Sequence, residues 1–470
     1  TGGAVTALAS ANNSTAVNIF SDTINNLSST GASVTVAGIS ITGGTGTVSI
    51  YSNILSNIRG TGVTSPIAQG LAVSGGATVN IYRNKVYDIA ENGISTGATV
   101  NGFNITGGTN VTCYNNIIGD LRAPSVSSTA AVRGILINST IANSTYRLFY
   151  NSVYLNATST GTNFGTYGLF HASSATSTTA RLILINNVII NTSTSNGTGL
   201  TIAYYRSAAV LNNYDLSSNN NLFYAGIPST RNVLLSASST TYRTLNDLQV
   251  VVTPREINSV TENTVFLSTT ASSTNFLRPD TTVASATESG GINIADFTAD
   301  YTDNIRQGNP GSISTGTAPD LGAFEQNGIP FINSVIVTGA LVGNGSYATL
   351  GTAFTAINGG TQTGANITVT ITKNTDELSS SASLNAGTWA SLTIIPDGPR
   401  IITGATTAGS ALINFNGADN VTINGRNTDV NSLSIINTTV SATAGTSTIR
   451  FIADAGNNTI TNCTISGSSN

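Results

Sequence analysis

The sequence is poor in several residue types, and each shortage argues against a class of structure or function. Only 8% of its 470 residues are charged, against about 25% in a typical soluble domain. The net charge is −4, and a nucleic-acid partner is not expected because phosphate binding needs clustered Lys and Arg. One His and two distant Cys, Cys113 and Cys463, leave no disulfide framework and argue against a zinc or iron site.

Methionine and long apolar runs are missing as well. The sequence has no Met, so we expect residue 1 to lie inside a longer protein. No run of about 20 apolar residues occurs, and we expect no membrane span. Ser, Thr, Asn and Gly take the place of charged residues, while 39% of the chain is hydrophobic and regularly placed. This composition indicates many short strands with uncharged polar corners rather than disorder.

What the sequence does contain is a repeat. Its stretches align on one polar residue with successive spacings of 31, 31, 32, 35, 35 and 34 residues. The aligned residues are Asp22, Asn53, Asn84, Asn116, Asn151, Asn186 and Asn220. A second ladder, of glycine followed by an apolar residue, runs through Gly38, Gly70, Gly102, Gly134, Gly168 and Gly199. Two motifs that keep one period indicate a repeat architecture.

Each repeat has the pattern of short strands. Apolar and polar residues alternate from Val48 to Asn53, which is typical of a half-buried strand. The glycine motif supplies a second strand, and a third, weaker strand follows the Asn, as at 54–58 and 86–89. We therefore predict a right-handed parallel β-helix with three strands and three corners in each rung. Its inner column is predicted to be Ile19, Ile50, Ile81, Cys113, Leu148 and Ile183.

The rhythm stops after Asn220, and this divides the chain. We predict β-helix rungs over 1–226, closing rungs and an end cap over 227–327, a linker over 328–335, and the start cap and first rungs of a second β-helix over 336–470. Helical spacing of apolar residues predicts one short capping helix near 346–358, with Ser346 as its N-cap. If the chain is one window on a tandem array, the sequence after residue 470 is expected to resemble residues 1–30.

Three segments carry a resemblance to a known group of proteins. They are GSYATLGTAFTAING (345–359), ADNVTINGRN (418–427) and DYTDNIR…APDLGAFE (300–325). They resemble the opening helix, an early rung and the closing signature of large parallel β-helix repeat proteins of Bacteroidetes-type bacteria. Asn424 stands where that family often has Asp, and Asn304 where Gly is usual. The resemblance implies a secreted or cell-surface, adhesin-like protein, often exported by type IX secretion. It also implies contacts that close the array, made by Asp300, Asp303, Arg306, Asp320 and Glu325.

Two columns of side chains are candidate functional features. The Asn ladder is predicted to be structural, because stacked Asn side chains bond along a column and tolerate left-handed backbone. An outward aromatic column is predicted to stack on itself or on the faces of sugars. Its members are Phe20, Tyr51, Tyr82, Tyr114 and Phe149.

The acidic pair Asp88 and Asp120 is a third candidate. Each residue lies four positions after a ladder Asn, and paired carboxylates serve glycoside hydrolysis or hold Ca²⁺. Asn26 and Asn57 occupy the same column, which favours a polar corner, and Arg122 could neutralise the pair. Beyond Ca²⁺ at this pair or at the closing cluster, no cofactor is predicted. The single His171 has no partner base or nucleophile nearby and is predicted to be structural.

The predicted function is a structural or adhesive rod segment of a large secreted or cell-surface bacterial repeat protein, in one version a filament. The alternative is a carbohydrate-binding or carbohydrate-cleaving β-helix. The chain is predicted not to be an enzyme, because β-helix enzymes need several titratable groups on one face, and scattered arginines such as Arg181 do not supply them. The predicted partners are neighbouring copies or repeats and surface glycans, and the predicted location is extracellular or the bacterial cell surface.

Overall fold

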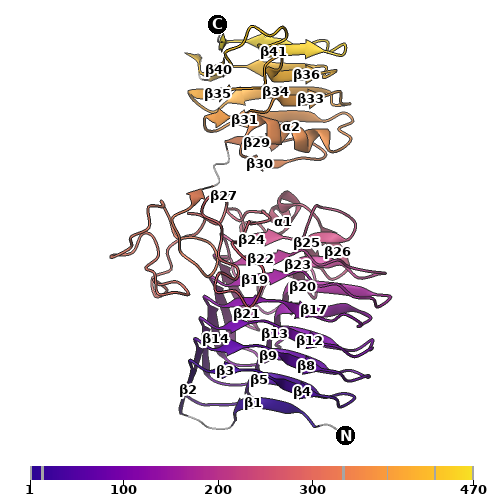
Figure 1. Ribbon diagram of the computed structural model, residues 1–470, viewed down its shortest axis with the longest axis vertical. Coiled ribbons are helices and arrows are strands. Elements are labelled where there is room, and N and C mark those ends of the chain that lie inside the picture. The colour runs from indigo at the N-terminus through magenta and orange to yellow at the C-terminus, as the bar shows by residue number, and fades with distance from the viewer. Residues whose placement is uncertain (1–2, 12–14, 331–333, 378, 428–429, 468–470) are drawn as a thin grey trace. The chain divides into compact units, whose positions relative to one another are not determined.

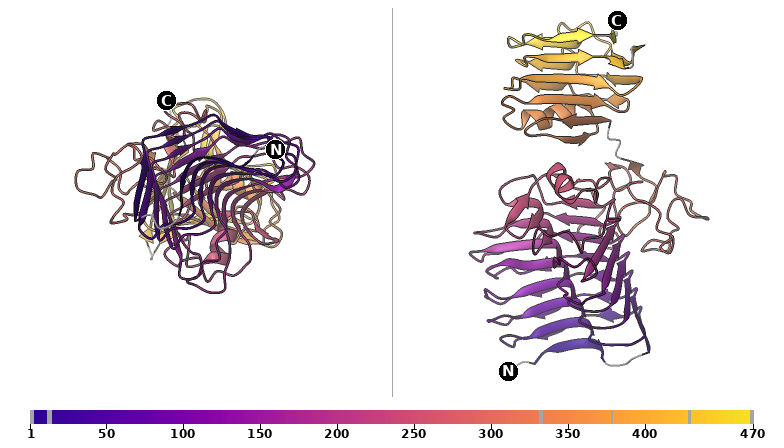
Figure 2. Two further views of the ribbon diagram at one scale, coloured as in Figure 1. Left: turned by 90° about the horizontal axis from the view of Figure 1, so that it is seen from below. Right: turned by 180° about the vertical axis from the view of Figure 1, so that it is seen from behind.

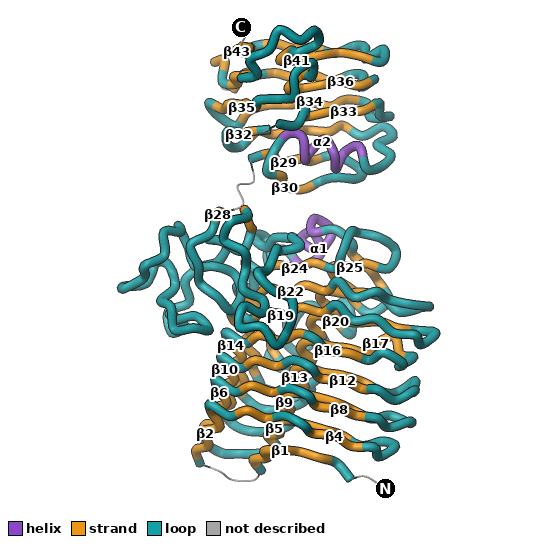
Figure 3. The backbone as a smooth tube through the Cα atoms, in the orientation of Figure 1, coloured by secondary structure: helices purple, strands orange, loops and turns teal. Residues whose placement is uncertain are grey.

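The computed structural model describes residues 3–11, 15–330, 334–377, 379–427 and 430–467. Its strands form parallel coils stacked one on the next, as Figures 1 and 3 show. The predicted parallel β-helix in two successive segments is therefore confirmed. The two compact units are Thr1–Pro330 and Phe331–Asn470. Their boundary falls within the predicted linker 328–335, of which residues 331–333 lie outside the described residues.

In the first unit, four sheets run along the β-helix, and Figure 2 shows the stacked coils from two further directions. The first sheet contains β1 (Val5–Ser10), β5 (Thr35–Ile41), β9 (Ile67–Val73), β13 (Thr99–Ile105), β17 (Ser128–Ile137), β20 (Phe164–His171), β23 (Thr201–Arg206), β25 (Asn232–Ala237) and the antiparallel β26 (Thr240–Tyr242). The second contains β2 (Ala16–Phe20), β6 (Thr47–Tyr51), β10 (Thr78–Tyr82), β14 (Asn110–Tyr114), β18 (Thr145–Phe149) and β21 (Arg181–Ile185). The third contains β3 (Thr23–Ile24), β7 (Ile54–Leu55), β11 (Lys85–Val86), β15 (Ile117–Gly119), β19 (Ser152–Leu155), β22 (Val188–Asn191) and β24 (Leu222–Tyr224). The fourth contains β4 (Leu27–Ser29), β8 (Ile58–Gly60), β12 (Ile89–Glu91) and β16 (Leu121–Arg122).

The fourth sheet corrects the prediction of three strands in each rung. The predicted third strand is broken by one residue with left-handed backbone, such as Asn57 (φ 50°) or Asp88 (φ 55°). A polar residue of this kind tolerates positive φ and turns the chain sharply. Two short strands, for example β7 and β8, therefore replace the single one.

The apolar residues of each rung point inward and form continuous columns. Ile50, Ile81 and Cys113 lie in register and are fully buried. The predicted column is wrong at its last position, because Leu148 pairs with Leu184 while Ile183 lies one residue out of phase and is half-buried.

The glycine ladder has a steric cause. A Cβ atom at Gly70 would lie 2.4 Å from Val86 Cγ1 and 2.9 Å from the carbonyl oxygen of Gly102 in the next rung. The ladder also departs from prediction at its end, because Leu169 pairs with Tyr204, so that Ala203 takes the position assigned to Gly199.

The first β-helix is closed by a helix that the sequence analysis did not predict. Helix α1 (Leu245–Val252) begins with a capping box in which Thr244 and Asp247 each accept a hydrogen bond from the other's backbone N–H. Leu248 and Val252 are buried in the hydrophobic core of the β-helix. The described residues therefore contain two helices, not one.

Residues 262–327, named here the side segment, lie along the flank of the first β-helix rather than over its end. Phe276 packs against Ile117, and Phe297 packs against Tyr114 and Phe149. The segment holds the short β27 (Ala284–Ser285), which pairs with β28 (Ile329–Pro330). Its loops are seen beside the coils in Figures 1 and 3. The predicted end cap at 227–327 thus divides into a closing part and a lateral brace.

The second unit repeats the architecture with three main sheets. The first contains β30 (Gly345–Tyr347), β29 (Val335–Thr338), β31 (Asn366–Ile371), β34 (Ser391–Pro396), β37 (Val421–Asn424) and β42 (Thr459–Thr461). The second contains β32 (Thr375–Asp376), β35 (Arg400–Gly404), β40 (Leu433–Asn437) and β43 (Cys463–Gly467). The third contains β33 (Ala382–Asn385), β36 (Ala411–Asn416) and β41 (Ser447–Ile452), and β38 (Arg426–Asn427) pairs with β39 (Val430–Asn431).

Helix α2 (Leu350–Asn358) begins later than predicted. Its N-cap is Thr349, which exchanges capping-box hydrogen bonds with Thr352, whereas Ser346 belongs to β30. Leu350, Ala353, Phe354 and Ile357 are buried, and the helix packs against β33. Strand β29 pairs antiparallel with β31 and covers the first parallel strand of this unit.

Candidate functional site

The Asn ladder is a buried hydrogen-bonded column. The Asn84 side chain donates to Asn116 Oδ1 at 3.0 Å and to the Ile50 carbonyl at 2.8 Å. It accepts the backbone N–H and the side-chain amide of Asn53 at 3.1 and 3.0 Å. The same pattern continues through Asn151, and the ladder residues Asn53 to Asn151 are 0% exposed. Because each amide uses its donors and acceptor inside the protein, this column holds the rungs together.

The prediction is wrong for the last two ladder positions. Asn151 bonds to Asn187 at 2.9 Å, and Asn187 bonds to Asn221 at 3.0 Å. Asn186 and Asn220 each precede the ladder residue and have positive φ, 61° and 55°. The left-handed geometry predicted for the ladder Asn therefore belongs to the residue before it, as it does at Ser52 and Asn115.

Asn186 and Asn220 hold the side segment instead. Asn186 donates to the Ile292 carbonyl at 2.7 Å and accepts from the Ile292 N–H at 3.0 Å. Asn220 donates to the carbonyl of Gly290 at 2.9 Å. These contacts tie the flank of the β-helix to a segment about 70 to 106 residues further along the chain.

The aromatic column stacks on itself. Phe20, Tyr51, Tyr82 and Tyr114 have successive ring centroids 4.9, 4.8 and 4.7 Å apart with interplanar angles of 2°, 4° and 8°. Each inner ring therefore uses both faces on its neighbours and turns its edge outward. Sugars stack on ring faces, so this geometry favours the structural interpretation of the column. Burial, with Tyr51 close by, raises the pKa of Tyr82 above its usual range.

Phe149 does not belong to the exposed part of this column. It is 5% exposed, and Phe297 of the side segment packs edge-on against both Tyr114 and Phe149 at 4.8 and 5.0 Å. The side segment therefore covers the end of the aromatic column, which removes Phe149 from any surface that a glycan could reach.

Asp88 and Asp120 face arginines. Asp88 forms ion pairs with Arg59 and Arg122, and Asp120 pairs with Arg122 at 3.1 Å. Burial raises the pKa of Asp120 above its usual range and the Asp88 charge adds to this, while Arg122 opposes it. A metal ion would have to displace guanidinium groups, so this geometry supports a polar corner. Over the described ranges, no group of three or more His, Cys, Asp and Glu side chains is arranged to hold a metal ion.

The closing cluster fastens the side segment to the β-helix. Arg306 is fully buried, lies 3.7 Å from the centroid of the Tyr150 ring, and donates to Asn115 Oδ1 at 2.8 Å. It also forms an ion pair with Glu325 at 3.5 Å. The exposed Asp303 reaches back to pair with Arg83.

The carboxylates of this cluster are occupied by backbone N–H groups. Asp300 accepts from the N–H of Glu325 at 2.8 Å, and Asp320 accepts from those of Ser289 and Gln326, both at 2.8 Å. Burial, reinforced by the charges of neighbouring acidic groups, raises the pKa of Asp320 to about 8. The cluster orders irregular loops, and its geometry is that of a structural clasp.

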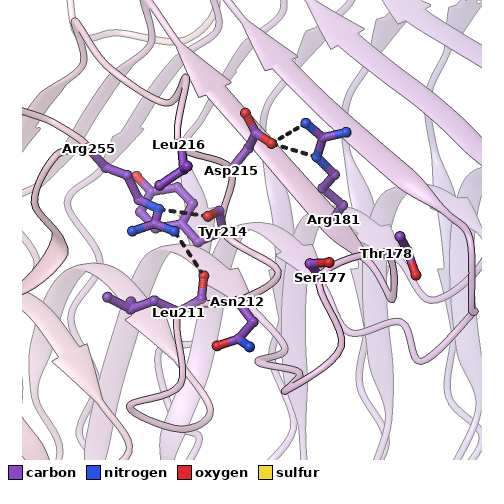
Figure 4. Close-up of a pocket in the computed structure, with 9 residues that line it drawn as sticks. All are labelled: Ser177, Thr178, Arg181, Leu211, Asn212, Tyr214, Asp215, Leu216 and Arg255. Carbon is purple, nitrogen blue, oxygen red and sulfur yellow. Dashed lines mark hydrogen bonds and ion pairs between the residues drawn. The ribbon is translucent and has the colours of Figure 1, made fainter.

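A pocket of about 490 Å³ opens near the closing end of the first β-helix (Figure 4). It is lined by Ser177, Thr178, Arg181, Leu211, Asn212, Tyr214, Asp215, Leu216 and Arg255. Arg181 stands at the start of β21 and pairs with Asp215 from the next rung. Arg255, which follows α1, donates to the carbonyls of Tyr214 at 2.6 Å and Val252 at 3.2 Å.

A buried polar network lies behind this pocket. His171 is fully buried and lies 2.7 Å from the Arg206 guanidinium through Nδ1 and 2.8 Å from the Ala180 carbonyl through Nε2. Burial and the Arg206 charge lower the pKa of His171 to about 3. Tyr214 donates to Glu256, and burial raises the pKa of both groups. The predicted structural role of His171 agrees with these contacts.

From the sequence, Arg181 is only one of several scattered arginines, and the other residues of this pocket are not predicted. One signal was present, because Arg181 and Asp215 are 34 residues apart, which is one repeat, and opposite charges one repeat apart lie in neighbouring rungs. No periodic signal marks Arg255, which is brought to the pocket by the turn after α1.

Comparison with known proteins identifies no family for the chain. No family model and no curated protein matches the chain. Among solved structures, the chain is similar to a mutant of a PL6-family alginate lyase, at 12% identity over 98% of this chain and 75% of that chain, with a TM-score of 0.15. At that score the likeness carries no argument about a site, a substrate or a mechanism. Because the similar protein is a lyase, the prediction that the chain is not an enzyme is contradicted and is withdrawn, and no activity is assigned in its place.

Proposed function

We propose that this chain is a stiff structural segment, with an adhesive role, of a large secreted or cell-surface bacterial repeat protein. One observation carries the proposal, namely the buried ladder in which Asn53, Asn84, Asn116 and Asn151 bond to one another from rung to rung. Separating two rungs breaks the strand pairing and also leaves buried amides without partners, which is costly. A β-helix built in this way resists bending and stretching.

The proposed location and partners follow from the resemblance of three segments to secreted Bacteroidetes-type β-helix proteins. We place the protein outside the cell or on the bacterial surface, exported by a type IX-like route, in contact with neighbouring copies or repeats and with surface glycans. The scarcity of charged side chains, 8% of residues, and the abundance of Ser, Thr, Asn and Gly are consistent with this location. No helix in the described part of the chain has the length and apolar character needed to cross a membrane.

The experiment uses the bacterium that carries the gene. Antibodies against the chain are expected to label intact cells, and deletion of the gene is expected to reduce attachment to a glycan-coated surface. Complementation with Asn110→Ala, an exposed residue of β14, should restore attachment. Complementation with Asn84→Ala, which breaks the ladder, should restore it poorly. Labelling that requires cell lysis, or attachment that does not depend on the gene, would overturn the proposal.

The second candidate function is carbohydrate binding. The observation that favours it is the pocket beside Arg181 and Arg255, since pockets of about 300 to 1,000 Å³ with a few placed polar groups are typical of small-molecule sites. Titration of the whole chain with neutral and acidic sugars tests this candidate, and the absence of binding to either class would contradict it.

A further inference from the structure

The pocket near the closing end of the first β-helix carries an inference about its ligand. It combines two arginines with the hydroxyl groups of Ser177 and Thr178 and the amide of Asn212. Figure 4 shows Arg181 with Asp215 on one side and Arg255 with Tyr214 on the other. The charge and the hydrogen-bonding groups of these residues determine which molecule can bind there.

The charges behind the pocket do not balance. The Tyr214 ring lies between two guanidinium groups, with Arg206 at 5.3 Å and Arg255 at 5.5 Å from its centroid. Glu256 is the buried carboxylate beside them and accepts hydrogen bonds from Tyr214 and Asn221. Over the described residues, neither Arg206 nor Arg255 forms an ion pair within 4.0 Å of a carboxylate. Two cations thus face one carboxylate.

The other charges at the pocket cancel, because Arg181 is paired with Asp215. One positive charge is therefore left over in this group, and of Arg206 and Arg255 only Arg255 lines the pocket. An electropositive pocket with low-dielectric walls attracts an anion more strongly than an exposed arginine does.

Arg255 also has donors to offer. Its guanidinium group carries five N–H bonds, and three of them point to the backbone carbonyls of Tyr214, Val252 and Leu211 at 2.6, 3.2 and 3.3 Å. These bonds fix the plane of the group, which lies against the Tyr214 ring. One N–H bond on each terminal nitrogen is left over, and two such donors on one guanidinium group can bind a carboxylate.

We propose that this pocket binds a sugar that bears a carboxylate, with Arg255 holding the carboxylate and Ser177, Thr178 and Asn212 bonding its hydroxyl groups. Leu216 is 63% exposed, and Leu211 also lines the pocket. These two leucines offer the apolar contact that the C–H face of a sugar ring requires. The inference deepens the second candidate function, carbohydrate binding, and does not depend on the structural role of the β-helix.

The test is calorimetric titration of the whole chain with D-glucuronate and, as the matched control, D-glucose, which has CH₂OH in place of the carboxylate. We expect glucuronate to bind at least about tenfold more tightly than glucose, and binding to weaken as salt is added. A trisaccharide that contains the same uronate in the middle and one that contains it at the end distinguish a free acidic sugar from a polymer segment. Inorganic sulfate that competes as well as glucuronate would overturn the sugar class in favour of a general anion site.

Two variants decide whether Arg255 and its charge are responsible. Arg255→Gln is expected to lower glucuronate affinity by about tenfold or more. Because that variant also loses bonds to the backbone, Asp215→Asn is the decisive one, since it removes a negative charge, frees Arg181 and is expected to raise the affinity by about threefold to tenfold. A gain of affinity cannot come from misfolding. The matched control is Asp397→Asn, which breaks the exposed Arg400 pair in the second unit and should change nothing.

The outcomes separate this inference from the function on which it rests. Equal binding of glucose and glucuronate, unaffected by Asp215→Asn, would overturn the acidic-sugar inference and leave carbohydrate binding intact. No binding of any sugar would overturn both. Preference for glucuronate, lost in Arg255→Gln and raised in Asp215→Asn, would support both.

Discussion

Replacement of Asn84 by Ala tests the ladder directly. The change removes one acceptor and two donors from a fully buried column. The backbone N–H and the side-chain amide of Asn53 lose their acceptor, and the Ile50 carbonyl loses a donor. Each buried polar group left unpaired costs roughly 1 to 3 kcal/mol. Because Asn116 keeps the Asn84 backbone N–H, we expect a total loss of about 3 to 6 kcal/mol.

The assay exploits the single tryptophan. Trp389 lies in the second unit, is 5% exposed, and donates its indole N–H to the Asp419 carbonyl at 2.7 Å. Urea unfolding followed by Trp fluorescence therefore reports the second unit, while far-ultraviolet circular dichroism reports both. Asn84→Ala should move the circular dichroism transition of the first unit to lower urea and leave the fluorescence transition in place.

The matched control is Asn110→Ala, which changes an exposed Asn of β14 in the first unit. A surface substitution of this kind is expected to change the free energy of unfolding by no more than about 0.5 kcal/mol. If Asn84→Ala falls within about 1 kcal/mol of this control, the ladder does not contribute as the hydrogen bonds indicate. A shift of the fluorescence transition would instead show that the two units do not unfold independently.

Four further predictions concern the side segment and the interior. Burial raises the pKa of Asp320 to about 8. The stability that its protonated form contributes is therefore fully present below the unfolded pKa of about 4 and is lost as pH rises through 8. The urea midpoint of the first unit should fall across that pH range, and Asp320→Asn should make the fall smaller. Arg306→Gln should release the side segment and speed its limited proteolysis, because it removes a buried cation that joins the segment to the β-helix. Asp303→Asn, at an exposed residue, should not change the rate of proteolysis. Equal proteolysis rates in the two variants would show that the closing cluster does not fasten the segment. Cys113 is fully buried, and burial raises the pKa of its thiol, so it should react with a thiol reagent only after unfolding, and prompt reaction in the native protein would be evidence against the inner column. Gly70→Ala places a Cβ 2.4 Å from a neighbouring side chain and should destabilise the first unit by about 1 to 3 kcal/mol in the same urea assay.

The ladder could be predicted from the sequence because equivalent residues of successive rungs are neighbours in space. The period alone could not choose between Asn186 and Asn187, which are adjacent and chemically identical. The choice is made by backbone geometry, since Asn186 has positive φ and faces the side segment, while Asn187 turns into the ladder. A repeat thus predicts reliably which columns of side chains exist. Where the rung length changes, it predicts less reliably which residue occupies each column.

The side segment could not be placed from the sequence because it has no period and its contacts are long-range. Its main anchor joins Arg306 to Asn115 across 191 residues. On the β-helix, Asn115, Asn186 and Asn220 each precede a ladder residue, and each bonds to the segment. The resemblance in the closing motif indicated ion pairs and turn contacts, and the structure shows that they fasten a brace to the flank.

The pocket lies where the repeat is interrupted, and the bonding between rungs explains this location. Inside the regular rungs, polar side chains of the columns bond to side chains one rung away, as Asn84 does to Asn116 and as Asp88 does to Arg122. Such columns leave few donors or charges for a ligand. Arg255 comes from outside the repeat, after α1, and therefore has no counterpart in the next rung. In a β-helix of this kind, binding chemistry is to be expected where the repeat is interrupted, because only there are charged groups brought together without their periodic partners.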